Sequence, residues 1–407
     1  MRKLFVLLAL GIFAAGLLTT TGSAAGASSH ASACASQPGK MGRFSGIVHA
    51  QAISGSTCDP TSRLGADPPL LWGGGPVMAN DPAHPITITP IYWEPNSPNG
   101  SPLFYNPSRY RNLINQYLAD VAAASGGDDN VYSTAIEYPG SNGSNGYNIV
   151  AGTPIRDHNL LPKGQGCSVG KLDTSNIYAD GSGYSACLDD AQITAEIQNV
   201  ITANNLPSDY NHEYVMLTPK HVASCFYAGS TANKKNVCTL THYPSAGYCA
   251  YHTMFGPNYP FSGTVYANMP YPIYQSPVGF TCGSDGGGHG TIESPNYLGD
   301  PVDKDADVEV SPLSHEIMES ITDPNTTNGW FDASGNENGD DCAYVYGAGS
   351  GAGGNGSWAD LFGTPGMLYN QIINNHHYIT QEEFSNADWF HTDGAGGCVR
   401  SESAVTP

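Results

Sequence analysis

The chain has 407 residues, with 15 Lys and Arg against 36 Asp and Glu, and a net charge of −21 at pH 7. A chain this acidic repels other polyanions, which excludes nucleic acids and anionic membrane surfaces as partners. Few Lys, 49 Gly, 24 Tyr and an acidic balance suit a soluble extracellular protein.

The first 25 residues have the three parts of a secretory signal peptide. Met1-Arg2-Lys3 is basic, residues 4–18 are almost wholly apolar, and small residues follow around Ser23-Ala24-Ala25. The apolar run is too short for a stable membrane span, and no other run is long enough, so we expect export without membrane insertion after cleavage. Cleavage leaves 13 Lys and Arg against 36 acids, a net charge of −23.

Beyond the signal peptide, composition predicts two segments. Residues 26–75 are rich in Ser, Ala, Gly and Pro, which predicts a flexible N-terminal segment. Residues 76–407 are expected to form a single domain, since no internal repeat divides them.

Helical and extended patterns alternate along this domain. Apolar periodicity predicts helices over 109–124 and 189–204. β-branched and aromatic runs predict strands at 85–93, 131–137, 214–218, 248–252, 264–267, 368–371 and 377–381. The 214–218 strand is expected to be central, and the last two to form a hairpin. This order predicts an α/β or α+β fold, with a mixed β-sheet flanked by helices and a metal-site helix late in the chain.

That late helix is predicted between Ser311 and Pro324. Ser311 can accept the first free amide as an N-cap, and Pro312 suits the first helical position. Pro324 should end the helix. Every fourth residue from Leu313 to Ile321 is apolar, which gives the helix one stripe for packing on a core.

Opposite this stripe lies a His-Glu-x-x-Glu motif. His315 and Glu319 are four residues apart, so they point the same way and can share one Zn²⁺. Glu316 stands where a general base would activate water. A Glu in place of the second His is acceptable to zinc but makes the metal a weaker Lewis acid. An ordinary exposed polar face explains the pentad equally well.

A third ligand is sought downstream, between Trp330 and Cys342. Glu337 and Asp340 follow a Gly-rich turn and lie beside a Cys that a disulfide could fix. Carboxylates in a fixed loop are better ligands than free surface acids, although turns are commonly rich in Asn, Asp and Gly. The predicted metal ligands are therefore His315, Glu319, Glu337 and Asp340.

Two other polar features are assigned less weight. Asp303, Asp305 and Asp307 alternate, as in Ca²⁺-binding loops, but the Gly and the closing Glu of an EF-hand are missing. We expect a solvated acidic turn there, with structural Ca²⁺ as the less favoured alternative. His252 lies on an apolar strand, where we expect a half-buried histidine rather than a ligand.

The ten Cys of an exported chain indicate disulfides. The expected pairs are Cys167 with Cys187, and Cys342 with Cys398. Two more pairs are expected among Cys225, Cys238, Cys249 and Cys282. No C-x-x-C occurs, so a Cys-based zinc site is discounted.

Several stretches resemble the plant phosphate-induced, or Exordium-like, secreted proteins and their bacterial relatives. The most specific are the His315–Glu319 motif and the segment from Glu337 to Cys342. Further matching runs are Thr89–Trp93, Thr218–Lys220, Cys249–His252, Thr322–Pro324 and Tyr378–Asn386 with Cys398. The resemblance covers most of the chain from residue 84 and implies export without implying a reaction. The helix is also similar to that of zincin peptidases.

These observations leave two functions open. One is a secreted zinc-dependent, peptidase-like hydrolase with Glu316 as general base. The other is a non-catalytic extracellular protein with a structural metal that binds a cell-surface glycan or protein. Metal analysis and a Glu316→Gln variant separate them.

Overall fold

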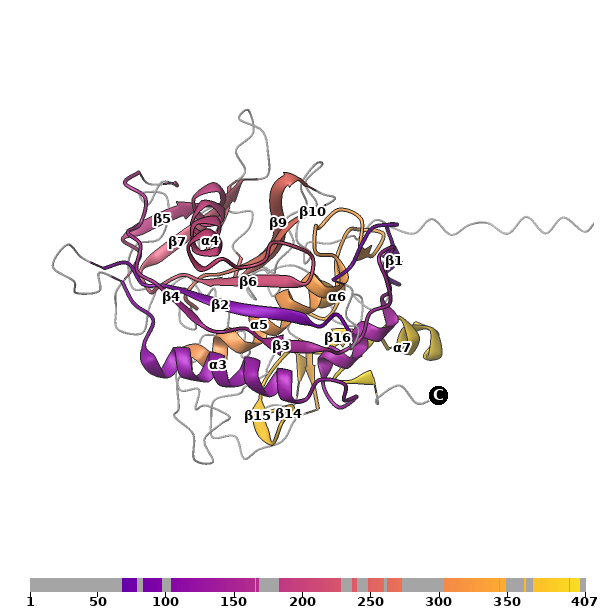
Figure 1. The fold of residues 1–407 in the computed structure, drawn as a ribbon. Helices are drawn as coiled ribbons and strands as arrows, with labels where there is room; N and C mark the ends of the chain where they lie inside the picture. Colours follow the sequence, from indigo (N-terminus) through magenta and orange to yellow (C-terminus); the bar gives the residue numbers. More distant parts are fainter. Residues whose placement is uncertain are drawn as a thin grey trace, which may run out of the picture. The chain divides into compact units, whose positions relative to one another are not determined.

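A computed structural model describes most of the chain beyond residue 67 (Figure 1). It covers residues 68–78, 83–96, 104–164, 166–167, 183–227, 236–239, 248–259, 262–272, 304–343, 345–348, 362–363, 369–394 and 396–402. All of these lie in the compact unit of residues 31–407. The expected signal peptide, Cys34, Cys58, Cys282 and Asp303 lie outside the described residues.

Most of the expected elements are present, with some bounds shifted. The helices are α3 (Ser108–Ala123), η1 (Val131–Glu137), α4 (Asp190–Asn204), α5 (Lys304–Thr322), α6 (Asn338–Asp341) and α7 (Asn386–His391). The strands are β1 (Leu71–Trp72), β2 (Ile86–Trp93), β3 (Ile149–Ala151), β4 (Ile155–Asp157), β5 (Ala186–Asp189), β6 (His212–Leu217), β7 (Val222–Tyr227), β8 (Asn236–Cys238), β9 (Tyr251–Asn258), β10 (Ser262–Met269), β11 (Trp330–Phe331), β12 (Val345–Gly347), β13 (Phe362–Gly363), β14 (Gln371–Ile373), β15 (His376–Tyr378), β16 (Glu383–Phe384) and β17 (Cys398–Val399).

The main sheet is mixed, as expected. Its order is β3-β2-β6-β10-β9, and β4 pairs with the second half of β2. β3, β2, β6 and β10 run parallel to one another, while β9 is antiparallel to β10 and forms one edge. β6 lies in the middle, which confirms the predicted central strand. The α/β or α+β class is therefore correct.

Side-chain alternation along β6 sends successive residues into two separate cores. Val215 and Leu217 pack in the core that contains α3 and α5. Tyr214 and Met216 pack in the core that contains α4. Figure 1 shows α4 on one side of the sheet and α3 with α5 on the other. Each such side chain contributes roughly 1.5–3 kcal/mol when buried, so this alternation fixes the register of the sheet.

Residues 131–137 form a 3₁₀ helix rather than the expected strand. The Oδ1 atom of Asn130 accepts a hydrogen bond from the backbone of Tyr132 at 3.1 Å. The hydroxyls of Ser133 and Thr134 donate to the carbonyls of Asn130 and Val131 at 2.7 and 2.8 Å. These local bonds satisfy the backbone without a neighbouring strand, which overrides the β-branched pattern.

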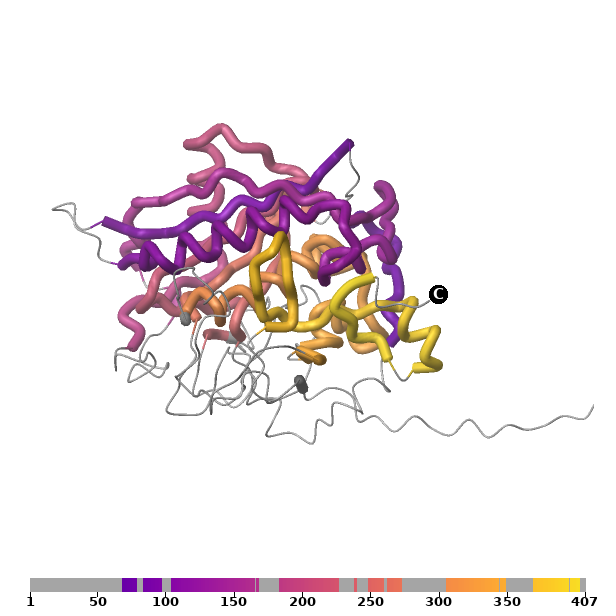
Figure 2. The backbone as a smooth tube through the Cα atoms, turned by 90° about the horizontal axis from the view of Figure 1, so that it is seen from below, coloured from indigo at the N-terminus to yellow at the C-terminus, as the bar shows by residue number. Residues whose placement is uncertain are grey.

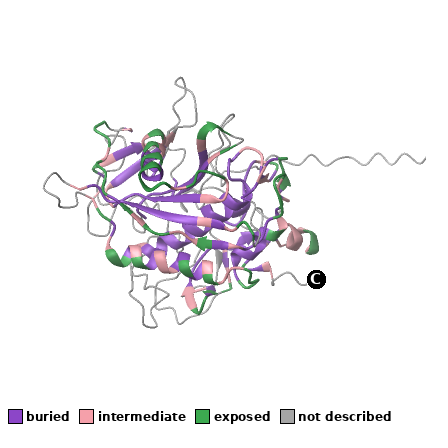
Figure 3. Cartoon of the chain, viewed as in Figure 1, coloured by how far each residue is buried: buried purple, intermediate pink, exposed green. Residues whose placement is uncertain are grey.

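Helix α5 begins at Lys304, so the predicted N-cap at Ser311 is wrong. Pro312 lies inside the helix, where a missing N–H and a steric clash cost about 3 kcal/mol. The upstream turns offset this cost by burying Ala306, Val308 and Val310 in the core. Figure 3 shows the helix buried along most of its length. The helix ends before Pro324, as predicted.

The same shift changes the role of the acidic residues before the motif. Asp305 and Asp307 lie in the first turn of α5, where the helix dipole favours negative charge. Asp307 is only 2% exposed. The predicted solvated acidic turn is therefore wrong for these two residues, and they do not alternate along a calcium-binding loop.

The late hairpin is confirmed as β14 and β15, which pair antiparallel. Its two turn residues, Asn374 and Asn375, have φ of 48° and 67°, which Asn tolerates better than most residues. The hairpin is held to α3 through Asp120, whose carboxylate lies 2.8 Å from Nδ1 of His376. Figure 2 shows this yellow segment beside α3 and near α5.

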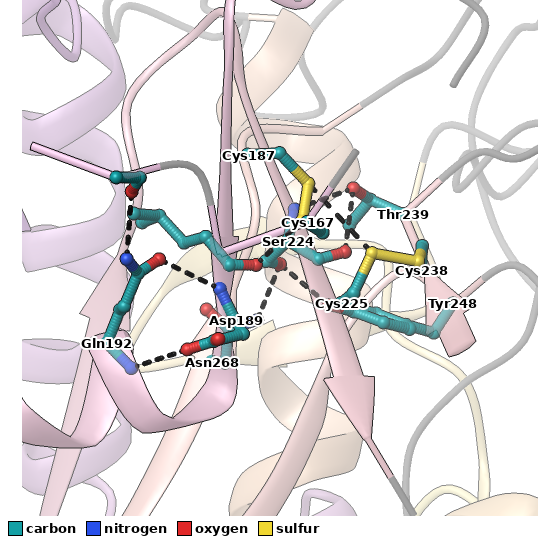
Figure 4. The surroundings of a disulfide bond; sticks show 12 residues. Cys167, Cys187, Asp189, Gln192, Ser224, Cys225, Cys238, Thr239, Tyr248 and Asn268 are labelled. Atoms are coloured by element: carbon teal, nitrogen blue, oxygen red, sulfur yellow. Dashed lines mark hydrogen bonds between the residues drawn. A yellow bond between two sulfur atoms is a disulfide. The ribbon is translucent and has the colours of Figure 1, made fainter. Parts of the chain in front are cut away.

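Three disulfides join described residues, and all agree with prediction. Cys167 pairs with Cys187, Cys225 with Cys238, and Cys342 with Cys398. Cys249 is disulfide-bonded as well. Figure 4 shows the first two bridges together, beside Ser224, whose hydroxyl lies 2.6 Å from that of Tyr248.

The expected boundary at residue 75 falls inside a described region. Leu71 and Trp72 form β1 and pair with Phe331 and Trp330 of β11. Residues 71–72 therefore belong to a paired strand rather than to a flexible segment. Among the described helices, none is both long enough and apolar enough to cross a membrane.

Candidate metal centre

One turn of α5 carries three buried ionisable side chains. His315, Glu316 and Glu319 are each 0% exposed. Leu313 and Ile317, from the apolar stripe of the helix, pack in the core that also contains α3, and this packing fixes the rotation of α5. The exposed polar face considered from sequence is therefore wrong for this helix.

The first group of potential ligands is His315, Glu319 and Asp340. Nε2 of His315 lies 3.0 Å from Oε1 of Glu319 and 3.9 Å from Oδ1 of Asp340. Two ligands of a tetrahedral Zn²⁺ with bonds of about 2.0–2.1 Å lie roughly 3.3 Å apart. The Nε2 atom is buried and makes no hydrogen bond. These atoms converge on one point, as ligands of one cation do.

Helix α6 brings Asp340 to this position. The backbone amide of Asp340 donates to Oε1 of Glu319 at 3.0 Å, which joins α6 to α5. The next residue but one, Cys342, is tied to Cys398 by a disulfide. The expected fixing of the acidic segment by a disulfide is confirmed.

The imidazole of His315 is held on its other side by Gln381 and Gly339. The amide of Gln381 donates to the carbonyl of Gly339 at 2.8 Å and lies 2.8 Å from Nδ1 of His315. In the neutral ring, Nδ1 accepts from this amide and the ring proton is on Nε2. A cation on Nε2 replaces that proton and requires an acceptor at Nδ1. A rotation of the Gln381 amide would place its Oε1 atom, which makes no hydrogen bond, beside Nδ1 of His315 as that acceptor.

A second group contains His252, Glu316 and Glu319. His252 is 0% exposed on edge strand β9, opposite Ala267 of β10. Its Nδ1 atom lies 3.3 Å from Oε2 of Glu316 and 3.5 Å from Oε2 of Glu319. Glu319 therefore faces a histidine with each of its oxygens and belongs to both groups.

Glu337 lies with His252 rather than with His315. Its Oε2 atom is 3.4 Å from Nε2 of His252. Of the two downstream carboxylates predicted as ligands, Asp340 is in the first group, whereas Glu337 is on the far side of the His252 ring. All five residues predicted for the site are thus brought into one buried region, around two potential cation positions.

Charges within the cluster reinforce one another. Burial favours the neutral form of His315, but the carboxylates of Glu319, Glu316 and Asp340 outweigh it and raise the pKa of His315 to about 10. Burial raises the pKa of Glu319, yet His315 and His252 hold that pKa down at about 2. Burial raises the pKa of Glu316 above its usual range. Glu319 is thus ionised, as a ligand must be.

Further buried carboxyl groups surround the cluster. Burial raises the pKa of Glu213 to about 8, although Ser320 donates to its Oε1 at 2.8 Å. Burial also raises the pKa of Glu309 and of Glu383 well above their usual values. Burial is the main cause of the raised pKa in each case, and the negative charges of neighbouring carboxylates add to it.

A third set of close residues, Cys167, Cys187 and Cys225, offers no metal site. Their sulfurs are engaged in disulfides, and thiolates are the form that binds metal. Among the described residues, the buried His, Glu and Asp groups around Glu319 are therefore the ones that could hold a metal ion.

His252 is the member of the cluster that the sequence interpretation missed. It was expected to be half-buried and structural, but it lies in the cluster. The signal was its place in Cys249–His252, one of the runs that carry the family resemblance. A strand places alternate residues on one face, and only the packing of α5 shows which face meets the motif.

No protein-family model, curated protein or solved structure matches the chain.

Proposed function

We propose that this protein is an exported, zinc-dependent hydrolase of the peptidase type. In this proposal His315, Glu319 and Asp340 hold the cation, and Glu316 is the general base. The observation that carries it is the convergence of Nε2 of His315 on carboxylates 3.0 and 3.9 Å away, without a hydrogen bond of its own. Nitrogen and oxygen donors in this mixture suit zinc.

Each side chain has a distinct task. A zinc ion in this site would supply Lewis acidity toward a substrate carbonyl and a water molecule. Glu316 would accept the proton of the attacking water at its carboxylate, and its raised pKa brings it nearer to the range of an effective base. With a proton on its Nδ1 atom, His252 would donate to Oε2 of Glu316 at 3.3 Å and orient that carboxylate. Export is supported by the signal-peptide pattern, the disulfides and the resemblance to Exordium-like proteins.

A second candidate is a non-catalytic extracellular protein with a structural metal. It is favoured by burial, because His315, Glu316 and Glu319 are each 0% exposed. Catalytic zinc sites keep one position open to substrate, whereas structural sites are closed. Its partner would be a cell-surface glycan or protein.

Metal analysis and one variant separate the two candidates. Mature protein is purified without added metal and assayed for zinc, then tested on a fluorogenic peptide library. Glu316→Gln should retain the zinc held by His315, Glu319 and Asp340 and lose at least a hundredfold in turnover. Glu196→Gln, which changes a buried carboxylate in the α4 layer, is the matched control and should retain both. Zinc without peptide cleavage in any variant favours the structural role, and absence of stoichiometric metal refutes both.

A further inference from the structure

Glu319 lies between two histidines rather than beside one. Its Oε1 atom lies 3.0 Å from Nε2 of His315, and its Oε2 atom lies 3.5 Å from Nδ1 of His252. Oε2 is buried and makes no hydrogen bond. A buried, ionised oxygen in this state is costly unless a proton or a cation compensates it.

The Nε2 side of His252 is arranged as in a metal-binding histidine. Its Nε2 atom lies 3.1 Å from the backbone carbonyl oxygen of Asp323. A carbonyl can only accept, so Nε2 carries a proton. Nδ1 faces the carboxylates of Glu316 and Glu319, and that approach is favourable only with a proton or a cation between these atoms. Metal-binding histidines commonly donate their other N–H to a backbone carbonyl in this way.

The separations also fit one shared cation. Nδ1 of His252 is 3.3 Å from Oε2 of Glu316 and 3.5 Å from Oε2 of Glu319. Two donors on a tetrahedral divalent ion with bonds of about 2.0–2.1 Å lie roughly 3.3 Å apart. The three donor atoms all lie within 4.8 Å of one another.

We infer that the centre has a second cation position, formed by His252, Glu316 and Glu319. Glu319 bridges the two positions, with one oxygen for each. Two divalent ions would balance the four carboxylates of Glu316, Glu319, Glu337 and Asp340. Imidazole and carboxylate donors suit Zn²⁺ or another late divalent transition metal.

This position has a regulatory consequence that rests on the proposed function. A cation on Oε2 of Glu316 lowers the basicity of that carboxylate, so Glu316 accepts a proton from water less readily. The first equivalent of zinc, on His315, Glu319 and Asp340, therefore activates hydrolysis, and the second lowers its rate. The competing occupant of the second position is a proton on Nδ1, which makes His252 an imidazolium paired with these carboxylates.

Metal stoichiometry distinguishes the cation from the proton without relying on activity. Full-length mature protein is stripped with a chelator and titrated with Zn²⁺ by calorimetry at neutral pH, and bound zinc is counted after gel filtration. Wild type should bind two equivalents and His252→Gln one. The matched control is His376→Gln, which removes a histidine paired with Asp120 on the β15 hairpin and should leave two equivalents. One equivalent in wild type, or a second that persists in His252→Gln, overturns the inference.

Turnover measured in the same titration keeps the two proposals apart. The second equivalent should lower turnover at least tenfold below its value at the first. Wild type that binds one equivalent and is active at excess zinc refutes the second position and leaves the hydrolase proposal standing. Wild type that binds two equivalents and cleaves nothing refutes the hydrolase and leaves the second position standing. If His252→Gln does not fold, the wild-type stoichiometry still decides.

Discussion

Replacing Gly339 by alanine should weaken metal binding by pushing His315 out of position. A Cβ atom at Gly339 would lie 2.5 Å from Nδ1 of His315 and 2.8 Å from both Cγ and Cε1. An ordinary contact begins at 3.4 Å, so the ring must move by about 0.9 Å. The ring cannot move without disturbing its contact with Gln381 at 2.8 Å and its approach to Glu319 at 3.0 Å.

A shift of this size is several times the tolerance of a metal–ligand distance, which is about 0.2 Å. We expect the affinity for the first zinc equivalent to fall about 10–100-fold, which corresponds to roughly 1.4–2.7 kcal/mol. Overpacking should also destabilise the metal-free protein by about 1–3 kcal/mol.

Competition against a chromophoric chelator measures the affinity, and urea unfolding of stripped protein measures the stability. Gly164→Ala is the control, because a Cβ atom there meets nothing within 4 Å. An unchanged zinc affinity in Gly339→Ala would mean that the His315 ring is not a ligand held in place by this backbone.

Four further outcomes are expected. Chelation should destabilise the wild type by about 2.7 kcal/mol when compared with protein at zinc levels 100-fold above its Kd, and added zinc should restore the melting temperature. Gln381→Ala should weaken zinc binding about 10–100-fold without abolishing folding, as judged by chelator competition and circular dichroism, because it removes the group beside Nδ1 of His315. Cys342→Ser should cost about 4 kcal/mol in urea unfolding, because the bridge to Cys398 closes a loop with a separation of 56 residues. Burial raises the pKa of Glu382 from 4.5 to about 7, so the folded state binds this proton more tightly than the unfolded state. Its contribution to the free energy of unfolding is fully present below pH 4.5 and is lost as the pH rises through about 7. Glu382→Gln should remove that loss, on the order of 3 kcal/mol, in urea unfolding between pH 5 and 8, and an unchanged pH profile would contradict the assignment.

Local sequence signals were sufficient for many elements of the fold. Apolar periodicity predicted α3 and α4, because a helix buries one stripe whatever it packs against. The β-branched and aromatic runs at β2 and β6 predicted strands, because such side chains pack well on a pleated sheet. At residues 131–137 a similar run formed a 3₁₀ helix, since Asn130 and two hydroxyls satisfied the backbone locally. The start of α5 was misplaced because a favourable cap at Ser311 was outweighed by apolar residues upstream.

The sequence by itself determined the helical part of the site, which carries His315 and Glu319. The spacing of His315 and Glu319 puts both on one face of any helix that contains them, and the disulfide of Cys342 fixed the acidic segment nearby. Only the tertiary structure decided which downstream carboxylate meets which histidine. It placed Asp340 with His315 and Glu337 with His252, and it brought His252 to Glu319 across 67 residues of chain. Contacts between β9 and α5 depend on sheet register and helix rotation, which the burial of side chains in the whole core sets and which no local spacing encodes.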